Sequence, residues 1–192
     1  EHMPLRAGAR PEGPLMRLYG RHDFGTLACF HVLDGRQYRD HQVCPRYRRG
    51  GANVVDDLHC PSRLEPQRSL LGEEQERWLY AGLSGSKARW NILAQPLLMA
   101  QADRKSGPER QFWTDGWDGY PAARTRLLQA VAERRPANPV VIGGDIHFHC
   151  VADLKADFDD PKSPVVASEF CGTSIASQGP PQARLDAMRA EN

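Results

Sequence analysis

One short stretch, residues 139–150 with the sequence PVVIGGDIHFHC, constrains the fold of this chain more than any other. Three β-branched residues in a row, at positions 140–142, are typical of a strand that is buried on both faces in the middle of a layered α/β domain. The glycines at 143 and 144 end that strand, because they let the backbone turn sharply and approach a ligand closely. The stretch therefore predicts a central strand whose carboxyl end carries polar side chains.

Asp145 and His147 follow the two glycines, at the edge of the sheet where open α/β folds hold their ligands. A carboxylate oxygen and an imidazole nitrogen two residues apart suit a borderline or hard metal ion better than a soft one. Both residues are therefore candidate metal ligands and catalytic residues. The spacing alone also allows a structural interpretation, in which Asp145 caps a turn and His147 is a half-buried histidine whose ring nitrogens are satisfied within the fold.

The other apolar runs predict strands and helices that alternate along the chain. A helix is expected at residues 73–83, whose acidic first turn suits the helix dipole, and another at 122–134 after Pro121. The order of strand, helix and strand that leads into residue 139 predicts a crossover unit and an α/β fold. The sequence also predicts an irregular N-terminal arm, strands at 16–19, 26–33, 90–100, 151–158 and 165–170, a hairpin turn at 20–25, a surface loop at 50–68 and a helical run at 181–192.

Arg36 lies just after the strand expected at 26–33, in the sequence DGRQYRD. A strand that delivers guanidinium groups to one edge of a sheet can bring them to an anion, because the arginine fork matches phosphate oxygens bidentately. Arg36 is therefore a candidate for substrate binding and catalysis. An ordinary structural ion pair between Asp34 and Arg36 explains the same spacing.

Two further segments contain candidate site residues. Gln95 precedes Pro96, which lacks a backbone donor and must end or distort the strand there, so the glutamine side chain is left at a strand end. Residues 112–121 hold four aromatic residues, two Asp and two Gly in ten positions. This composition fits a ligand-facing loop, with Asp118 and Tyr120 as candidate substrate-binding residues, and it fits a compact turn pinned by aromatic side chains equally well.

Composition excludes several classes of function. With 25 Lys and Arg against 24 Asp and Glu, the net charge is +1, so no general basic field attracts nucleic acid. No apolar run reaches the roughly 18 residues of a membrane helix. The five cysteines contain no Cys-x-x-Cys pair, which argues against a zinc ribbon. Cys44 and Cys60 flank a loop and form the only plausible disulfide pair, and the sequence leaves open whether they are bonded.

Several stretches, taken in order along the chain, resemble the PhoD-like alkaline phosphatases of the metallophosphoesterase superfamily. The match is more specific than any single motif because it extends from residue 3 to residue 180. The stretches are LDGRQYRD at 33–40, LGEEQERWL at 71–79, WNILAQ at 90–95, WDGYP at 117–121, GDIH at 144–147 and SEFCGTS at 168–174.

The resemblance implies a four-layer α/β/β/α sandwich with metals at the carboxyl ends of its central strands, of which residues 1–192 form the C-terminal portion. It implies hydrolysis of phosphate mono- and diesters by a metal-activated water, without a Ser or Cys nucleophile, in an exported enzyme that uses iron and calcium. Asp145 and His147 occupy the position of the superfamily's late metal motif. Gln95 stands where many members place a metal-binding His and is the weaker candidate, while Arg36 could orient the substrate.

The family's early motifs, which carry an Asp-rich strand end, a bridging Asp and an Asn-type ligand, are expected upstream of Met3. Each ion of a binuclear site needs about four to six donors and a shared bridge, and only two strong candidates are present here. We therefore expect a fragment that does not hydrolyse esters by itself. The alternative is a catalytically dead half-domain or interaction module, and the substrate and oligomeric state are not indicated by the sequence.

Overall fold

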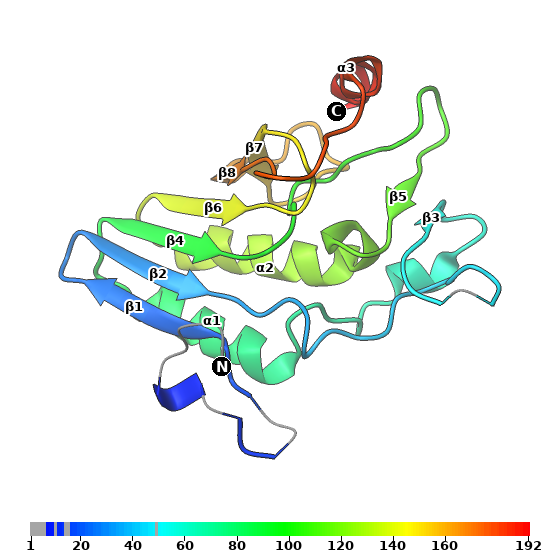
Figure 1. The fold of residues 1–192 in the computed structure, drawn as a ribbon. Coiled ribbons are helices and arrows are strands. Elements are labelled where there is room, and N and C mark those ends of the chain that lie inside the picture. The colour runs from blue at the N-terminus through cyan, green and yellow to red at the C-terminus, as the bar shows by residue number, and fades with distance from the viewer. Residues whose placement is uncertain (1–6, 10, 14–15, 49) are drawn as a thin grey trace.

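A six-stranded, mostly parallel sheet organises the structure, a computed structural model that describes residues 7–9, 11–13, 16–48 and 50–192 (Figure 1). The strand order is β1-β2-β4-β6-β8-β7. The four inner strands are parallel to one another, and β1 and β7 are antiparallel edge strands. The strands are β1 Gly20–Phe24, β2 Ala28–Val32, β4 Trp90–Ala94, β6 Pro139–Gly143, β7 Cys150–Lys155 and β8 Val165–Cys171.

Helices α1 (Glu73–Gly85) and α2 (Pro121–Arg134) lie side by side on one face of this sheet (Figure 1). Three acidic residues occupy the first turn of α1, where they favour the helix dipole, and Pro121 begins α2 as the sequence predicts. The main core forms between helices and sheet. Its fully buried members include Leu79, Leu83, Leu93, Leu127, Leu128 and Val141.

The crossover predicted from the sequence is present. The chain runs from β4 through α2 into β6, and strands β4 and β6 pair in parallel. As expected, β4 ends at Ala94, before Pro96 removes the next backbone donor. The last predicted helix is also present, as α3 (Gln182–Glu191).

The opposite face of the sheet stays exposed, which corrects the expectation that the central strand is buried on both faces. Ile142, Phe170 and Val151 are register partners across β6, β8 and β7, and they are 38%, 49% and 72% exposed. Phe24 and Trp90 flank Ala28 in the same way across β1, β2 and β4. The β-branched run at 140–142 does form a strand, as the sequence predicts, but α1 and α2 cover only one side of it.

The first hairpin is displaced from its predicted position. Residues 20–24 form strand β1 rather than the turn, and the turn lies at residues 25–27, where the Leu27 amide donates to the Phe24 carbonyl. Gly25 takes the left-handed conformation that this turn requires, with φ of 56°. The polar residues of β1 suggest a turn, but an edge strand with a largely exposed surface tolerates them.

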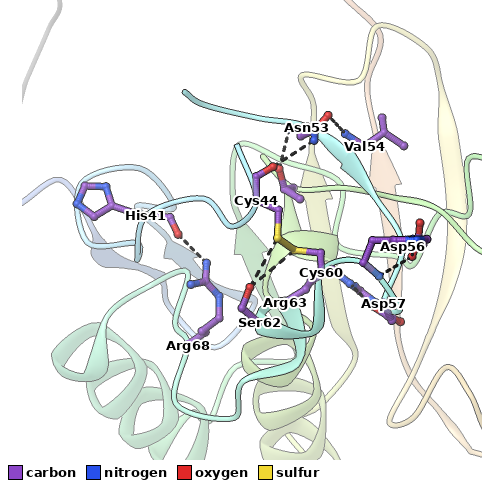
Figure 2. The surroundings of a disulfide bond; sticks show 12 residues. His41, Cys44, Asn53, Val54, Asp56, Asp57, Cys60, Ser62, Arg63 and Arg68 are labelled. Carbon is purple, nitrogen blue, oxygen red and sulfur yellow. Dashed lines mark hydrogen bonds and ion pairs between the residues drawn. A yellow bond between two sulfur atoms is a disulfide. The ribbon is translucent and has the colours of Figure 1, made fainter. Parts of the chain in front are cut away.

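The surface loop predicted at 50–68 is held by a disulfide between Cys44 and Cys60 (Figure 2). Cys29, Cys150 and Cys171 are free. The loop contains β3 (Val54–Val55), which pairs with β5 (Phe112–Trp113), and the short helix η2 (Pro61–Leu64). Two other short helices lie outside the loop, η1 (Ala7–Ala9) and η3 (Trp117–Gly119).

Much of the predicted N-terminal arm lies outside the described residues. None of the helices in the described ranges combines the length and apolar character needed to cross a bilayer.

Candidate active site at the carboxyl edge of the sheet

The carboxyl ends of the parallel strands bring four predicted site residues to the same edge of the sheet. Arg36 follows β2, Gln95 follows β4, and Asp145 with His147 follow β6. Because these strands are neighbours and run in the same direction, residues far apart in the sequence meet there. The structure therefore confirms the strand-end placement that the sequence predicts.

Asp145 and His147 line a cavity of about 450 Å³ at this edge. Both have positive φ, 70° and 61°, a conformation that is uncommon outside glycine and is concentrated at functional sites. Gly143 and Gly144 themselves do not have positive φ. The need for glycine at 143 comes instead from close packing, because a Cβ there would lie 2.8 Å from Cys171 Sγ and closer still to the carbonyl oxygen of Leu97.

Arg36 contacts two carboxylates at the mouth of the site. Its Nη1 donates to Asp115 Oδ2 at 2.7 Å, and its Nη2 lies 3.5 Å from Asp145 Oδ2. The ion pair with Asp34 that the sequence suggested does not form, because Asp34 Oδ1 accepts the backbone N–H groups of Arg36 and Gln37. Asp34 shapes the turn, and the Arg36 guanidinium contacts Asp115 and Asp145 instead.

Asp115 holds this arginine in place. It also accepts hydrogen bonds from Arg39 Nη1, at 3.0 Å, and from Gln42 Nε2. Burial disfavours the charged carboxylate, but the hydrogen bonds and charges of Arg36 and Arg39 outweigh it, so the pKa of Asp115 lies below its ordinary value. Asp115 is therefore a stable anion that fixes one side of the Arg36 fork.

Gln95 is committed to hydrogen bonds within the protein. Its Oε1 accepts the Leu97 N–H at 2.9 Å and the Trp117 indole N–H at 3.1 Å, while its Nε2 donates to the Leu97 carbonyl and lies 3.5 Å from Glu169 Oε1. The side chain is buried. In this arrangement Gln95 braces the segment after β4 and does not line the cavity.

Glu169, which is fully buried in β8, supports the same segment. Its two carboxylate oxygens accept the backbone N–H groups of Met99 and Ala100, each at 2.7 Å. Burial raises the pKa of Glu169 despite these hydrogen bonds. Together with Gln95, this carboxylate fixes the chain from residue 95 to 100, which leads into the cavity wall.

Asp118 and Tyr120, the candidates from the aromatic loop, are both tied to other parts of the protein. Asp118 lines the cavity, but its Oδ1 is 2.5 Å from Arg124 Nη1 in a buried ion pair, and its Oδ2 accepts the Ala102 N–H. Tyr120 is fully buried, and its hydroxyl donates to the Asp40 carbonyl. The loop is thus a compact turn pinned by buried aromatic residues, and it contributes to the cavity wall as well.

Comparison with known proteins identifies the family. Residues 1–192 match the family model described as PhoD-like phosphatase. The chain belongs to the PhoD-like phosphatase family. It is 42% identical over 179 residues to alkaline phosphatase D of Bacillus subtilis (strain 168), which covers 93% of this chain and 29% of that protein. A solved structure of PhoD superposes with a TM-score of 0.80 at 40% identity, over 92% of this chain and 32% of the other.

The resemblance inferred from the sequence is therefore confirmed, and so is the mixed α/β fold. This PhoD-like chain spans less than a third of the length of the curated relative that it matches. Its sheet with helices on one face corresponds to part of a larger domain.

The donors that this PhoD-like chain offers to a metal ion fit only part of a coordination shell. Asp145 and His147 are exposed, share one cavity and have the donor chemistry expected for such a site. Across the described ranges, however, no group of three or more His, Cys, Asp or Glu side chains is arranged to hold a metal. A complete shell would need donors beyond those that the described residues bring together.

Sequence reasoning missed Asp115 and the cavity residues Arg104, Trp113 and Arg184. Asp115 lies in the same aromatic loop as Asp118, and the composition of the loop cannot tell which of the two carboxylates faces Arg36. Arg104 and Arg184 lie far apart in the sequence and meet only through the placement of α3. No local pattern marks them.

Proposed function

We propose that this chain supplies part of the active site of a metal-dependent phosphoesterase that hydrolyses phosphate mono- and diesters. The observation that carries the proposal is the convergence of Asp145, His147 and Arg36 at the carboxyl edge of the sheet, beside one cavity. Membership of a phosphatase family supports phosphoester hydrolysis as the reaction class.

In this proposal, Asp145 and His147 donate an oxygen and a nitrogen to a metal ion, and residues outside this chain complete the shell. Iron and calcium are the ions that the family resemblance suggests. A metal ion bound there would supply Lewis acidity and would acidify a bound water. Gln95 supports the site from behind, through its hydrogen bonds with Leu97 and Trp117.

Arg36 binds the phosphate group in this proposal. Asp115 already fixes Nη1 at 2.7 Å, whereas the contact of Nη2 with Asp145 is longer, at 3.5 Å, and both side chains in that contact are at least 41% exposed. Nη2 can therefore turn to a phosphate oxygen when Asp145 is engaged elsewhere, and it would stabilise the charge on the equatorial oxygens. Asp118 would act on the substrate through the shape of the cavity wall, and the buried Tyr120 through the position of the loop behind it.

Export of the protein is part of the same proposal. The Cys44–Cys60 disulfide supports it, because disulfides persist in oxidising compartments and are rare in the cytosol of most organisms. Cys60 is the residue before η2, which carries Arg63, and the Arg63 guanidinium donates to the Asp118 carbonyl at 2.6 Å. The disulfide therefore supports the wall of the proposed active site.

The proposal is tested with Asp145→Ala and His147→Ala in an active protein that includes this chain. Each variant should lose bound metal and ester hydrolysis together. Asp153→Ala, which removes an exposed carboxylate from edge strand β7, serves as the matched control and should change neither quantity. Metal stoichiometry by mass spectrometry that stays unchanged in both site variants would overturn the assignment.

A second candidate function, an inactive half-domain that binds another protein, is favoured by the exposed apolar face around Ile142 and Phe170. Phosphate release and partner binding, measured on the same protein, separate the two functions. Phosphate release from a model ester that depends on added metal and on Asp145 identifies the enzyme. Its absence in a protein that still binds a partner through this face identifies the interaction module.

A further inference from the structure

Two arginines that form no ion pair with any described carboxylate line the same cavity as Asp145 and His147. Arg104 comes from the segment after β4, where its backbone N–H donates to the Gln111 carbonyl, and Arg184 comes from α3. These guanidinium groups thus reach one cavity from separate elements. Neither is needed to explain the proposed hydrolysis.

Three other arginines form ion pairs with Asp side chains, unlike Arg104 and Arg184. Arg36 pairs with Asp115, Arg124 pairs with Asp118, and Arg110 pairs with Asp159 at 2.7 Å. In the part of the chain that the structure describes, no ion pair or side-chain hydrogen bond joins the guanidinium group of Arg104 or Arg184 to an acceptor. The carboxylates of Asp115 and Asp118 also line the cavity, but each is already engaged by another arginine.

The surroundings of Arg104 orient its guanidinium group without giving it an ion pair among the described residues. Its guanidinium carbon lies 5.3 Å from the centre of the Trp113 ring, an arrangement that orients the group through a cation–π contact. Burial lowers the pKa of Arg104 and the positive charge of Arg184 lowers it further, and together they outweigh the negative charge of Asp118, which raises it. Two like charges held close together, one of them partly desolvated, are unfavourable unless an anion joins them.

We propose that Arg104, Trp113 and Arg184 form a second anion subsite, which binds a non-reacting anionic group of the substrate while its phosphate ester lies at Asp145, His147 and Arg36. The cavity, at about 450 Å³, has the size of a small-molecule site and is much larger than one phosphate group. The substrate class is therefore a phosphate ester whose alcohol carries a second phosphate or carboxylate. This inference rests on the proposed function for the reacting group only.

The first experiment measures anion binding without any hydrolysis. Inorganic pyrophosphate is titrated calorimetrically into the 192-residue chain at constant ionic strength. Arg104→Gln and Arg184→Gln should each weaken binding about tenfold, the loss expected for one charge-assisted hydrogen bond. Arg189→Gln removes the same charge from an exposed position on the same helix, outside the cavity lining, and should leave binding unchanged.

The second experiment compares two esters in an active protein that includes this chain. Glycerol 1,3-bisphosphate carries the second anionic group, and glycerol 1-phosphate lacks it. Arg104→Gln and Arg184→Gln should each lower the ratio of the two kcat/KM values about tenfold. Arg189→Gln should keep the ratio of the unmodified protein. Arg184 is exposed on α3, so its variant reports on the subsite even if Arg104→Gln destabilises the fold.

The outcomes separate this inference from the proposed function. Weaker pyrophosphate binding in both variants of the 192-residue chain, together with no metal-dependent ester hydrolysis by a longer protein that includes this chain, supports the subsite and contradicts the proposed hydrolysis. Hydrolysis that depends on Asp145, combined with an ester ratio unchanged by either variant, contradicts the subsite and keeps the proposed function. Pyrophosphate binding that weakens equally in Arg189→Gln also overturns the subsite, because the effect would then be one of overall charge.

Discussion

Arg36 joins two carboxylates that the chain delivers from different elements, and this geometry predicts the effect of replacing it. Lysine keeps the charge but has a single ammonium group, which cannot hold Asp115 and also reach toward Asp145 or a phosphate oxygen. Arg36→Lys should therefore lower kcat/KM, by a factor that corresponds to a loss of about 1–3 kcal/mol of transition-state stabilisation. Thermal stability should change little. Steady-state kinetics and thermal unfolding on the same preparation check both parts.

Arg21→Lys is the matched control for that substitution, since Arg21 forms an exposed pair with Asp23 on edge strand β1, which contributes no residue to the cavity lining. It should affect neither measurement. A large fall in melting temperature for Arg36→Lys, with the kinetic constants preserved, would instead make the arginine a structural brace.

His31 predicts how stability depends on pH. It is fully buried in β2 beside Trp78, and burial lowers its pKa to about 4, with a further contribution from the charge of Arg21. The unfolded chain takes up this proton near pH 6.5 and the folded chain only near pH 4. Between these values the unfolded state binds more protons, so stability should fall as the pH falls, by up to about 3 kcal/mol.

Urea unfolding of the unmodified protein and of His31→Leu between pH 4 and 7 measures this contribution. The variant removes the titrating ring while keeping an apolar side chain beside Trp78, so its stability should vary less over the same range. Within the described residues Nδ1 of His31 has no hydrogen-bond partner, so the substitution removes only the contact between Nε2 and Cys29 Sγ at 3.4 Å. Parallel pH profiles for the two proteins would show that His31 is not the responsible group.

At the scale of elements, the turn after β6 requires glycine at position 143 more than at position 144. A Cβ at Gly143 would meet the Leu97 carbonyl and the Cys171 and Gln95 side chains, whereas a Cβ at Gly144 would have its nearest neighbour at 4.0 Å. Gly143→Ala should destabilise the protein by about 1–3 kcal/mol, as overpacking does, and Gly144→Ala by less than about 0.5 kcal/mol. Equal midpoints of urea unfolding for the two variants would contradict this account.

The same turn shows why some elements could be predicted and others could not. Helix α2 and strand β6 have unambiguous local signals, Pro121 at the helix start and a β-branched run, and both form where the sequence places them. Strand β1 has no such signal, because its residues become a strand only by pairing with β2 at an edge. The strand-end positions of Asp145 and His147 follow from the local pattern, but the contact of Arg36 with Asp115 is set by tertiary packing across 79 residues.

At the scale of the whole molecule, the exposed apolar face predicts self-association of the isolated chain. Ile142 and Phe170 are register partners on that face. Exposed apolar patches of this kind drive association, and the edge strands β1 and β7 add unpaired backbone groups. Ile142→Thr combined with Phe170→Thr should shift the chain toward the monomer, because Thr keeps β propensity while reducing apolar area.

Sedimentation equilibrium measures that shift. The control replaces two exposed apolar residues elsewhere, Leu58→Thr with Ile175→Thr, whose side chains lie outside the six-stranded sheet. This control should associate like the unmodified chain. If both double variants become monomeric to the same degree, general hydrophobicity rather than the sheet face controls association.

The last prediction concerns activity of the 192 residues alone. Asp145 and His147 are two donors, Gln95 is held by Leu97 and Trp117, and no cluster of three His, Cys, Asp or Glu ligands occurs within the described residues. A metal ion held by two side chains would bind weakly and would change the acidity of a bound water little. The purified chain, supplied with iron and calcium, should therefore show no saturable hydrolysis of a nitrophenyl phosphate ester. Metal-dependent turnover that disappears in Asp145→Ala would prove this expectation wrong and would mean that this portion of the domain assembles a working site by itself, for example by pairing two copies through the exposed sheet face.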